Sequence, residues 1–350
     1  MPEITSAFEH RLVAALQPWR NLVLAHTLHQ GMNSGTFAAI RDTPVPLDEL
    51  SRRLNMNPER LGGFLQYLGN EGYVSVSAAG FTLTPAGREM EHFQPWYKLL
   101  VGGYGGTVAE LEKCLAADAG YAGRSGVDVG IGSCGMSLYD ALPLTVNLMS
   151  HIPAGVTTIV DLCCGSGESL ADLVEAMPGT KAVGVDPEAG SIKVAMEMAE
   201  ERGLQDRLQF HVGGMSDDLD LDLDPEGTCI ITAFGLQELL GQQGRDAVLR
   251  LVRDVFKAYP AAYWAVIEVD NRAGDPGVMA HTLSQAYYNP YYLLHCFVEQ
   301  RLETREFWIE LFEEAGAELL TAQTTDPRVD STGLEAGFLF RAKTRTTADD

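Results

Sequence analysis

The spacing of hydrophobic positions changes along the chain and divides it into two parts. Over the first ninety residues, apolar side chains recur every three or four positions, most clearly over 12–28 and 61–68. This spacing places them on one face of a helix. From Val156 onwards, short apolar runs alternate with helical patterns. The two parts therefore predict a helical N-terminal domain followed by an α/β domain.

The helical part carries signals for a small, defined fold. Asn57 and Pro58 precede the stripe at 61–68, and they suit the N-cap and first turn of a helix. Two short alternating stretches follow, at 73–76 and 81–84, on either side of Ala78-Ala79-Gly80. Helices followed by a two-stranded wing predict a winged-helix domain over residues 1–90. Such a domain binds DNA in some proteins and joins subunits in others, and we expect the second role here.

The second part predicts a doubly wound parallel sheet. Five β-rich runs, at 156–160, 182–185, 208–212, 229–234 and 264–269, are separated by helical segments. Alternating strands and helices form βαβ units, in which helices cover both faces of a parallel sheet. We predict this domain over residues 151–345. Residues 91–150 form an aromatic and glycine-rich connector, whose glycine clusters suit either a ligand or tight turns.

Charge and length narrow the possible functions. The chain has 350 residues and a formal net charge of -23. Such an acidic chain repels nucleic acid and anionic membranes, which argues against a DNA-binding regulator. No apolar run reaches the ~20 residues of a membrane span, and the first residues lack the pattern of a signal peptide. We therefore expect a cytoplasmic protein without nucleic-acid or membrane partners.

A candidate cofactor site lies at the end of the first β-rich run. Asp161 leads into a turn with Gly165 and Gly167, and the next run ends at Asp186. Glycines at a strand–helix junction allow a ligand to approach closely, and a carboxylate after the second strand can bind ribose hydroxyls. A dinucleotide oxidoreductase uses the same devices, but its fingerprint needs a glycine where this chain has Leu170.

The pattern instead resembles the first motifs of class I, Rossmann-like methyltransferases that use S-adenosylmethionine. That family usually has a glycine where this chain has Cys163. The resemblance extends to Gly214 and Met215 after the third strand and to Phe234 after the fourth. It implies that S-adenosylmethionine is bound by the following residues: Asp161, Gly165, Gly167, Asp186, Gly214, Met215 and Phe234.

The layout is similar to that of plant-type and antibiotic-pathway O-methyltransferases. In those enzymes a histidine after the fourth strand is the general base for a hydroxyl group. This chain has Gln237 at that position, and an amide does not accept a phenolic proton usefully. The ordinary O-methyl mechanism thus lacks its central residue.

Residues 295–316, together with Gln237-Glu238, resemble another family: the 2-oxo acid β-carbon methyltransferases of peptide-antibiotic biosynthesis. Its members act on phenylpyruvate, 4-methyl-2-oxopentanoate or 2-ketoarginine. The resemblance implies a metal-binding set of Gln237, Glu238 and His295, where phenylpyruvate enzymes have His, Asp and His. A divalent metal of the Zn, Fe or Ni type would fit it. Taken alone, His295 would be interpreted first as a core histidine that is hydrogen-bonded to a carbonyl group. Glu238 alone could be a salt-bridge partner or a carboxylate at a helix N-terminus.

The family's chemistry explains the need for a metal. The β-carbon of a 2-oxo acid becomes nucleophilic only as an enolate, which a chelated Lewis acid stabilises. C-methylation at C3 follows from attack on the sulfonium methyl group. The resemblance places Arg124 against the substrate carboxylate, although it could equally be a surface arginine. Pocket walls are expected from four aromatic side chains, which could also be core residues: Trp96, Tyr97, Tyr104 and Tyr139.

The expected activity is metal-dependent C-methylation of a 2-oxo acid, with 4-methyl-2-oxopentanoate or 2-ketoarginine as the favoured substrate. The alternative is a small-molecule O- or N-methyltransferase that needs no metal and works by proximity. A non-catalytic DNA-binding regulator is a third possibility, which the charge disfavours. From the architecture we expect a homodimer that is joined through the N-terminal helices.

Overall fold

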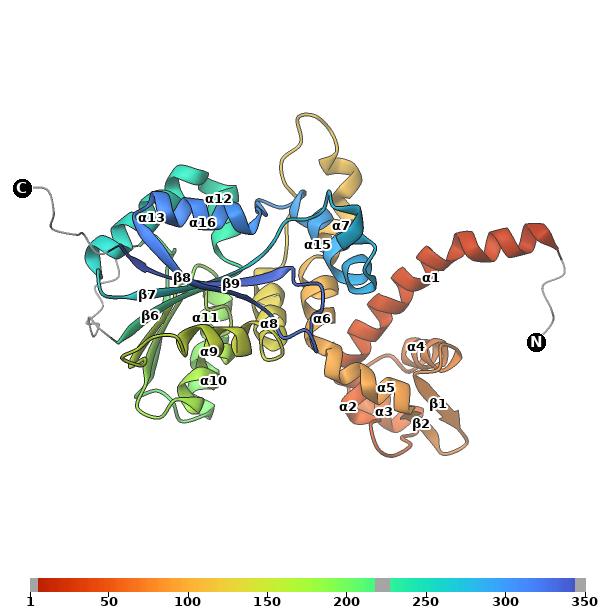
Figure 1. Cartoon of the computed structure of the whole chain (residues 1–350). Helices are drawn as coiled ribbons and strands as arrows, with labels where there is room; N and C mark the ends of the chain where they lie inside the picture. The colour runs from red at the N-terminus through yellow and green to blue at the C-terminus, as the bar shows by residue number, and fades with distance from the viewer. Residues whose placement is uncertain (1–5, 218–226, 344–350) are drawn as a thin grey trace, which may run out of the picture. The chain divides into compact units, whose positions relative to one another are not determined.

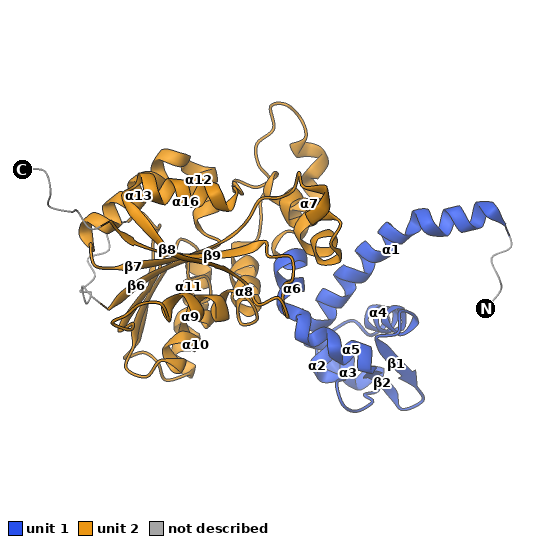
Figure 2. Ribbon diagram, in the orientation of Figure 1, with its two compact units in different colours: residues 1–102 blue, residues 103–350 orange. Residues whose placement is uncertain are grey.

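We describe a computed structural model of the chain that covers residues 6–217 and 227–343. Backbone contacts divide the chain into two compact units, Met1–Gly102 and Gly103–Asp350 (Figure 2). The sequence-based division at 90 and 150 remains a prediction. Among the described helices, none combines the length and the apolar character that crossing a membrane requires.

The first unit is mainly helical. Its predicted helix begins at Pro58, where the Asn57 side chain accepts a hydrogen bond from the Arg60 amide. The predicted strand pair is present and antiparallel. Buried side chains from four helices and both strands form the core, among them Phe37, Leu50 and Leu65. The elements are α1 (Ala7–Asn33), α2 (Thr36–Ala39), α3 (Leu47–Arg53), α4 (Pro58–Asn70), β1 (Val74–Ser77), β2 (Gly80–Leu83), α5 (Pro85–Met90), η1 (Glu91–Phe93), α6 (Gln94–Tyr97) and η2 (Lys98–Gly103).

The second unit is built on a seven-stranded sheet with the order β5-β4-β3-β6-β7-β9-β8. The first five strands of this order are parallel and match the five predicted runs. β9 runs antiparallel to its neighbours β7 and β8. The sequence pattern did not predict β8 or β9. The strands are β3 (Thr158–Asp161), β4 (Lys181–Asp186), β5 (Leu208–Val212), β6 (Thr228–Ala233), β7 (Tyr263–Val269), β8 (Ala317–Thr324) and β9 (Glu335–Ala342).

Helices cover both faces of this sheet (Figure 1). One face holds α8 (Gly126–Ser137), α9 (Ala141–Met149), α10 (Glu168–Ala176) and α11 (Ala189–Glu201). The other holds α12 (Leu236–Gln243), α13 (Arg245–Ala258) and α16 (Arg305–Glu314). Both layers bury apolar side chains against the strands, as expected for a doubly wound fold. The remaining helices are α7 (Gly105–Cys114), α14 (Pro276–Met279), η3 (Ser284–Tyr288) and α15 (Asn289–His295).

The fold gathers polar groups at one edge of the sheet. Parallel strands end on the same side, and ligands of open α/β sheets bind outside those carboxyl ends. Asp161 and Asp186 are the last residues of β3 and β4, and α12 starts shortly after β6. The functional site is therefore expected at this edge of the sheet.

Candidate active site

The turn after β3 needs its two glycines. Gly165 has a φ of +55° and Gly167 a φ of +77°, which side chains rarely allow. A Cβ atom at Gly167 would lie 2.5 Å from the ring of Phe210, on β5. The turn can thus pack closely against β5 and start α10 directly after Gly167.

Two carboxylates hold the backbone of this turn. Asp186 accepts a hydrogen bond from the Gly165 amide at 3.0 Å and another from the Glu188 amide at 2.9 Å. Asp161 accepts one from the Cys163 amide at 3.0 Å. Burial, together with the nearby charge of Asp186, raises the pKa of Asp161 to about 7. Near neutral pH, Asp161 can therefore exchange a proton or meet a cationic group.

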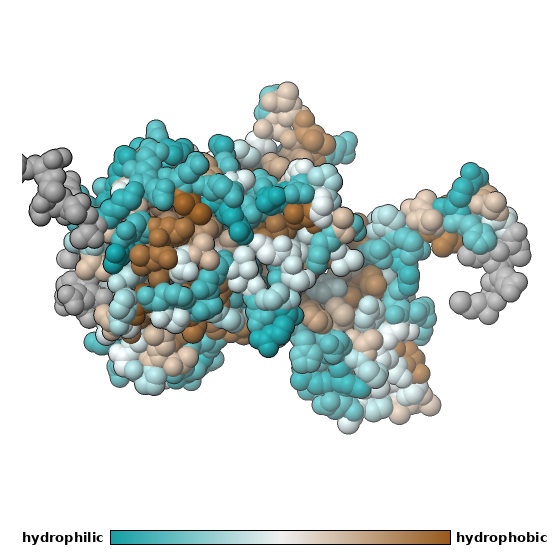
Figure 3. Space-filling model, in the orientation of Figure 1, coloured by the Kyte–Doolittle hydropathy of each residue, from teal (hydrophilic) through white to brown (hydrophobic). Residues whose placement is uncertain are grey.

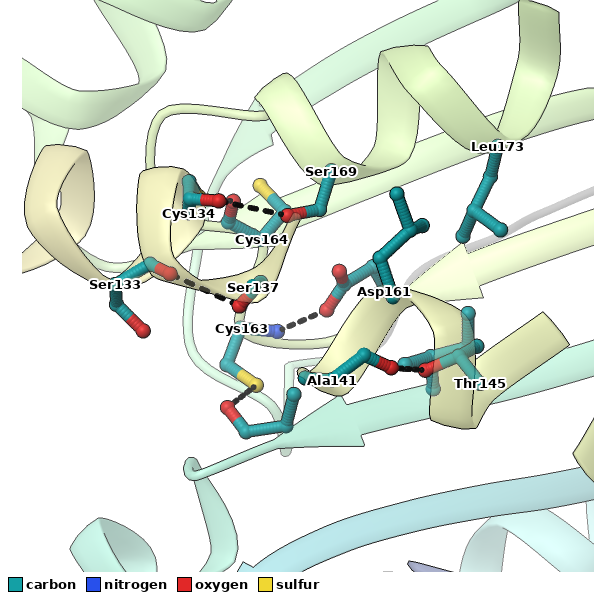
Figure 4. Close-up of a pocket in the computed structure, with 13 residues that line it drawn as sticks. Ser133, Cys134, Ser137, Ala141, Thr145, Asp161, Cys163, Cys164, Ser169 and Leu173 are labelled. Atoms are coloured by element: carbon teal, nitrogen blue, oxygen red, sulfur yellow. Dashed lines mark hydrogen bonds between the residues drawn. The ribbon is translucent and has the colours of Figure 1, made fainter. Parts of the chain in front are cut away.

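A pocket opens beside this turn (Figure 4). Asp161 contributes its carboxylate, and the hydroxyl groups come from α8, α9 and α10. Mixed polar and apolar walls of this kind suit a small ligand with charged groups. Its polar lining residues are Ser133, Ser137, Thr145, Asp161 and Ser169.

Cys163 occupies the position where related motifs have glycine, and the neighbouring loop accommodates it. The thiol donates to the Ala233 carbonyl at 3.4 Å. A Cβ atom at Gly235 would lie 2.5 Å from the Cys163 sulfur and 2.9 Å from the Met215 methyl carbon. Gly235 therefore leaves the room that the cysteine fills, and the loops after β3, β5 and β6 meet here.

The loop after β6 has an unusual backbone. Phe234 has a φ of +58°, a conformation that is rare for residues other than glycine. Its amide donates to the Ile267 carbonyl of β7 at 2.8 Å. After β5, the Gly214 amide donates to Asp217 at 2.7 Å. Strained non-glycine backbone often occurs at functional sites, which suits the predicted role of this loop.

Glu268, a buried carboxylate that the sequence analysis did not single out, binds the first amides of α12. Glu268 of β7 is 1% exposed and accepts hydrogen bonds from the Leu236 and Gln237 amides, at 2.9 and 3.4 Å. Burial raises the pKa of Glu268 to about 8. The signal was available, because a glutamate inside the apolar run 264–269 is unusual for a buried strand.

Gln237 and His295 lie side by side in this buried region. The Gln237 amide nitrogen donates to the Tyr291 hydroxyl at 3.1 Å and lies 3.4 Å from His295 Nε2. His295 Nδ1 lies 2.7 Å from the Tyr291 carbonyl. Burial lowers the pKa of His295 to about 4, with the charge of Arg124 adding to the effect. The neutral imidazole therefore donates from Nδ1, which leaves a lone pair on Nε2.

Gln237 Oε1 is buried and has no hydrogen-bond partner among the described residues. An unpaired buried acceptor is costly and needs an explanation, such as a ligand. Tyr104 closes the same region, since its ring centroid lies 5.7 Å from that of His295. Gln237, His295 and Tyr104 together form a polar centre, in which Gln237 Oε1 can still accept a hydrogen bond or bind a ligand.

Glu238 faces a cation. Arg124 Nη2 lies 2.5 Å from Glu238 Oε2, which also accepts from Gln300 at 3.1 Å. Gln242 donates to the other oxygen at 3.0 Å. The structure thus brings the connector arginine to the same centre, although it pairs Arg124 with Glu238. Among the described residues, no group of three or more His, Cys, Asp or Glu side chains could hold a metal ion.

The other predicted pocket residues are more dispersed. Tyr104 is buried, whereas Tyr139 is 44% exposed. Trp96 and Tyr97 belong to α6 of the first unit. Their role as pocket walls remains a prediction.

Comparison with known proteins agrees with this geometry. Residues 159–258 match the model of a methyltransferase domain. The chain is 45% identical to 2-ketoarginine methyltransferase of Streptomyces arginensis, over 95% of this chain and 96% of that protein. The chain belongs to the S-adenosylmethionine-dependent 2-oxo acid methyltransferases.

Solved methyltransferase structures share the fold of this enzyme. The mitomycin 7-O-methyltransferase MmcR has a TM-score of 0.66 at 16% identity, covering 95% of this chain and all of that chain. The O-methyltransferase NcsB1 from neocarzinostatin biosynthesis, in complex with S-adenosylmethionine, has a TM-score of 0.60 at 16% identity, covering 94% and 98%. The predicted class I methyltransferase fold is therefore confirmed for the second unit.

Proposed function

We propose that this methyltransferase transfers a methyl group from S-adenosylmethionine to C3 of a 2-oxo acid, with 2-ketoarginine as the substrate. The observation that carries the proposal is the identity with 2-ketoarginine methyltransferase along nearly the whole chain. This C-methylation would supply an unusual amino acid for antibiotic biosynthesis, in the cytoplasm. The polar centre around Gln237 and His295, where related O-methyltransferases need a base, also supports it.

The cofactor would lie at the carboxyl edge of the sheet. Asp186 suits the ribose hydroxyls, because its carboxylate already shapes the turn at Gly165. Asp161 suits the positive end of the cofactor's methionine moiety, since a nearby cation favours its charged form. The rest of the proposed set is Gly167, Gly214, Met215 and Phe234.

Gln237, Glu238 and His295 would hold one divalent metal of the Zn, Fe or Ni type. Two observations support the fit: the unpaired Oε1 of Gln237 and the lone pair on Nε2 of a neutral His295. Glu238 would offer an anionic oxygen while remaining paired with Arg124. When bound, the metal would act as a Lewis acid toward the keto and carboxylate oxygens of the substrate.

The residues of the chain would position the reaction. As the substrate enolises, its C3 proton passes to solvent water before the site closes, and C3 of the enolate then attacks the sulfonium methyl group. The new C–C bond forms as the C–S bond breaks, and S-adenosylhomocysteine leaves. Arg124 would attract the substrate carboxylate, and Tyr104 and Tyr139 would line the side-chain pocket. Burial of the centre keeps water from the enolate.

The test is a methyl-transfer assay with a panel of 2-oxo acids, before and after chelation and metal add-back. We expect turnover on 2-ketoarginine to be lost with chelator and restored by a divalent metal. His295→Ala should lower kcat/KM by about 100-fold or more, because losing a ligand should cost at least as much as the roughly 10–100-fold of losing a partner that only orients one. Chelator-insensitive turnover, with His295→Ala fully active, would instead support the metal-independent O- or N-methyltransferase.

The first unit would join two chains into a homodimer. In this proposal, its helices and strand pair form a winged-helix domain, and the antiparallel pairing of β1 with β2 supports it. On α1, large apolar side chains recur at spacings of three and four and are exposed: Phe8, Leu12, Leu16 and Trp19. In the space-filling view, hydrophobic residues interrupt the hydrophilic surface along this helix (Figure 3). A partner chain that covered this stripe would remove it from water.

A further inference from the structure

Asp140 and Glu335 are brought together by the packing of α9 on β9. Asp140 is the N-cap of α9, and Glu335 is the first residue of β9. Leu144 and Leu148 of α9 pack so closely on Gly337 that a Cβ atom there would lie 2.9 Å from each. This contact fixes the start of the helix beside the start of the strand.

Both carboxylates are buried and accept few hydrogen bonds. Asp140 is 9% exposed and accepts from the Ala141 amide at 2.6 Å. Glu335 is 4% exposed and accepts from the Thr325 hydroxyl at 2.8 Å. The Asp140 carboxylate also accepts from its own amide. Within residues 6–217 and 227–343, no further residue donates to either carboxylate, and neither forms an ion pair.

Their environment disfavours negative charge. Burial raises the pKa of Asp140 to about 7, and burial together with the charge of Asp140 raises the pKa of Glu335 well above its usual value. The third acid nearby, Asp330, is already engaged by the Tyr288 and Thr332 hydroxyls. Without a cation such groups stay protonated, and a cationic ligand would favour their charged forms, so the buried pair suits a cationic ligand.

A tyrosine wall connects this pair to the candidate active site. The Tyr287 and Tyr291 ring centroids lie 5.6 Å apart. Tyr291 accepts the hydrogen bond from Gln237 at one end. At the other end, Asp140 and Glu335 are close enough for their charges to raise the pKa of Tyr287, after the larger effects of burial and Tyr291.

Polar groups that could bind a ligand thus occur at both ends of this wall. Gln237 is 2% exposed, and its free Oε1 lies on the amide that contacts Tyr291. The carboxylates of Asp140 and Glu335, which have no cationic partner among the described residues, lie near Tyr287 at the other end. A ligand that contacts both ends would be elongated. One end would meet Gln237 through a hydrogen-bond donor or a bound metal, and the other end would carry a positive charge.

We propose that Asp140 and Glu335 bind the guanidinium group of the substrate and select 2-ketoarginine against uncharged 2-oxo acids. This inference rests on the proposed function. A guanidinium presents five donors in a planar fork, which suits two neighbouring carboxylates that have no other cationic partner in the described parts of the chain. Its flat face can also stack on the aromatic rings of the tyrosine wall.

The test compares 2-ketoarginine with 2-oxo-5-ureidopentanoate, in which a neutral urea of the same shape replaces the guanidinium. The variants are Glu335→Gln and Asp140→Asn, and the matched control is Glu318→Gln on β8, whose side chain reaches Arg341 on the surface. The quantity measured is the ratio of kcat/KM for the two substrates. We expect each site variant to lower this ratio at least ~30-fold, the scale of losing one partner of a buried charge pair. The control should keep the wild-type ratio.

Binding of S-adenosylmethionine by calorimetry checks that each variant is folded, and either site variant alone suffices for the comparison. A ratio that stays within about threefold of wild type in a folded variant would overturn the guanidinium assignment, while the proposed methyl transfer would stand. Methylation of uncharged 2-oxo acids but not of 2-ketoarginine by the wild type would also overturn it. No transfer to any 2-oxo acid would remove the proposed function itself.

Discussion

At the scale of single residues, Cys163 departs from the usual glycine of the motif, and Gly235 provides the space for its side chain. The thiol of Cys163 takes space that Gly235 leaves open, although the two are far apart in sequence. The same turn holds Asp161, whose burial favours the protonated carboxyl. The motif therefore sets the backbone turn, whereas its surroundings set the proton affinity.

Asp161 should make the folded state less stable as the pH rises. Its folded pKa of about 7 lies above the ordinary value of 3.8, so the folded state binds the proton more tightly between these values. The contribution to stability is complete below the unfolded pKa and is lost as the pH rises toward 7. Asp161→Asn removes this contribution. Between about pH 4 and 7, the free energy of unfolding of the variant should therefore rise relative to that of the wild type by about 1.4 kcal/mol per pH unit.

Urea unfolding at several pH values measures this difference in the free energy of unfolding. Asp206→Asn, at an exposed position, is the matched control and should show no such trend. A constant difference between Asp161→Asn and wild type from pH 4 to 7 would show that Asp161 is ionised in the folded state.

At the scale of elements, burial separates the helices of the catalytic unit from the first helix of the chain. α16 presses Phe312 onto Phe340 of β9, with ring centroids 4.3 Å apart, and onto Trp264 of β7, at 5.3 Å. α1 instead leaves Phe8 and Trp19 more than 60% exposed. The first arrangement stabilises a core, and the second suits association.

Phe312→Ala should destabilise the catalytic unit. Removing a fully buried phenylalanine from such a cluster leaves a cavity and costs about 3–5 kcal/mol. The expected result is a clear fall in the melting temperature of the second unit by calorimetry. Leu320→Ala on β8, where the side chain is 37% exposed, should cost far less. Similar losses for both variants would contradict the packing described here.

The apolar stripe of α1 should hold the dimer together. Leu12→Glu combined with Leu16→Glu places two charges on the stripe, and burying them unpaired is unfavourable. We expect the dimer to dissociate into folded monomers in analytical ultracentrifugation. Ala14→Glu, on another face of the same helix, should leave the dimer intact. A double variant that remains dimeric would place the interface elsewhere.

At the scale of the whole molecule, the net charge of -23 governs which partners can approach. An acidic surface repels phosphate backbones, because binding DNA requires cations that displace its counterions. A cationic substrate is in turn attracted by a negative field. The overall charge thus favours the small-molecule role for this fold.

The full chain should not retard duplex DNA in a mobility-shift assay at about 100 mM salt, since it lacks the positive surface that non-specific binding requires. The assay should use the protein at micromolar concentration with both random and palindromic duplexes. Clear retardation would revive the regulatory role of the N-terminal domain and contradict the argument from charge.

The sequence by itself determined the five parallel strands, the glycine turn after Asp161 and the membership of a methyltransferase family. These features depend on local pattern: apolar spacing sets an element, and a tight turn needs glycine at fixed positions. The antiparallel strands β8 and β9 escaped because their pairing joins distant segments, and strand patterns depend on what covers each face. Nor could local pattern reveal that Arg124 pairs with Glu238, or that Glu268 starts α12.

Only the tertiary structure showed which acidic residues are candidates for binding the substrate. The sequence offers 48 Asp and Glu residues, and nothing in their spacing distinguishes Asp140 and Glu335. Their burial and their place beside Tyr287 arise when α9 packs on β9. Proton affinity and ligand preference depend on distance and on exclusion of water, which are properties of the folded chain.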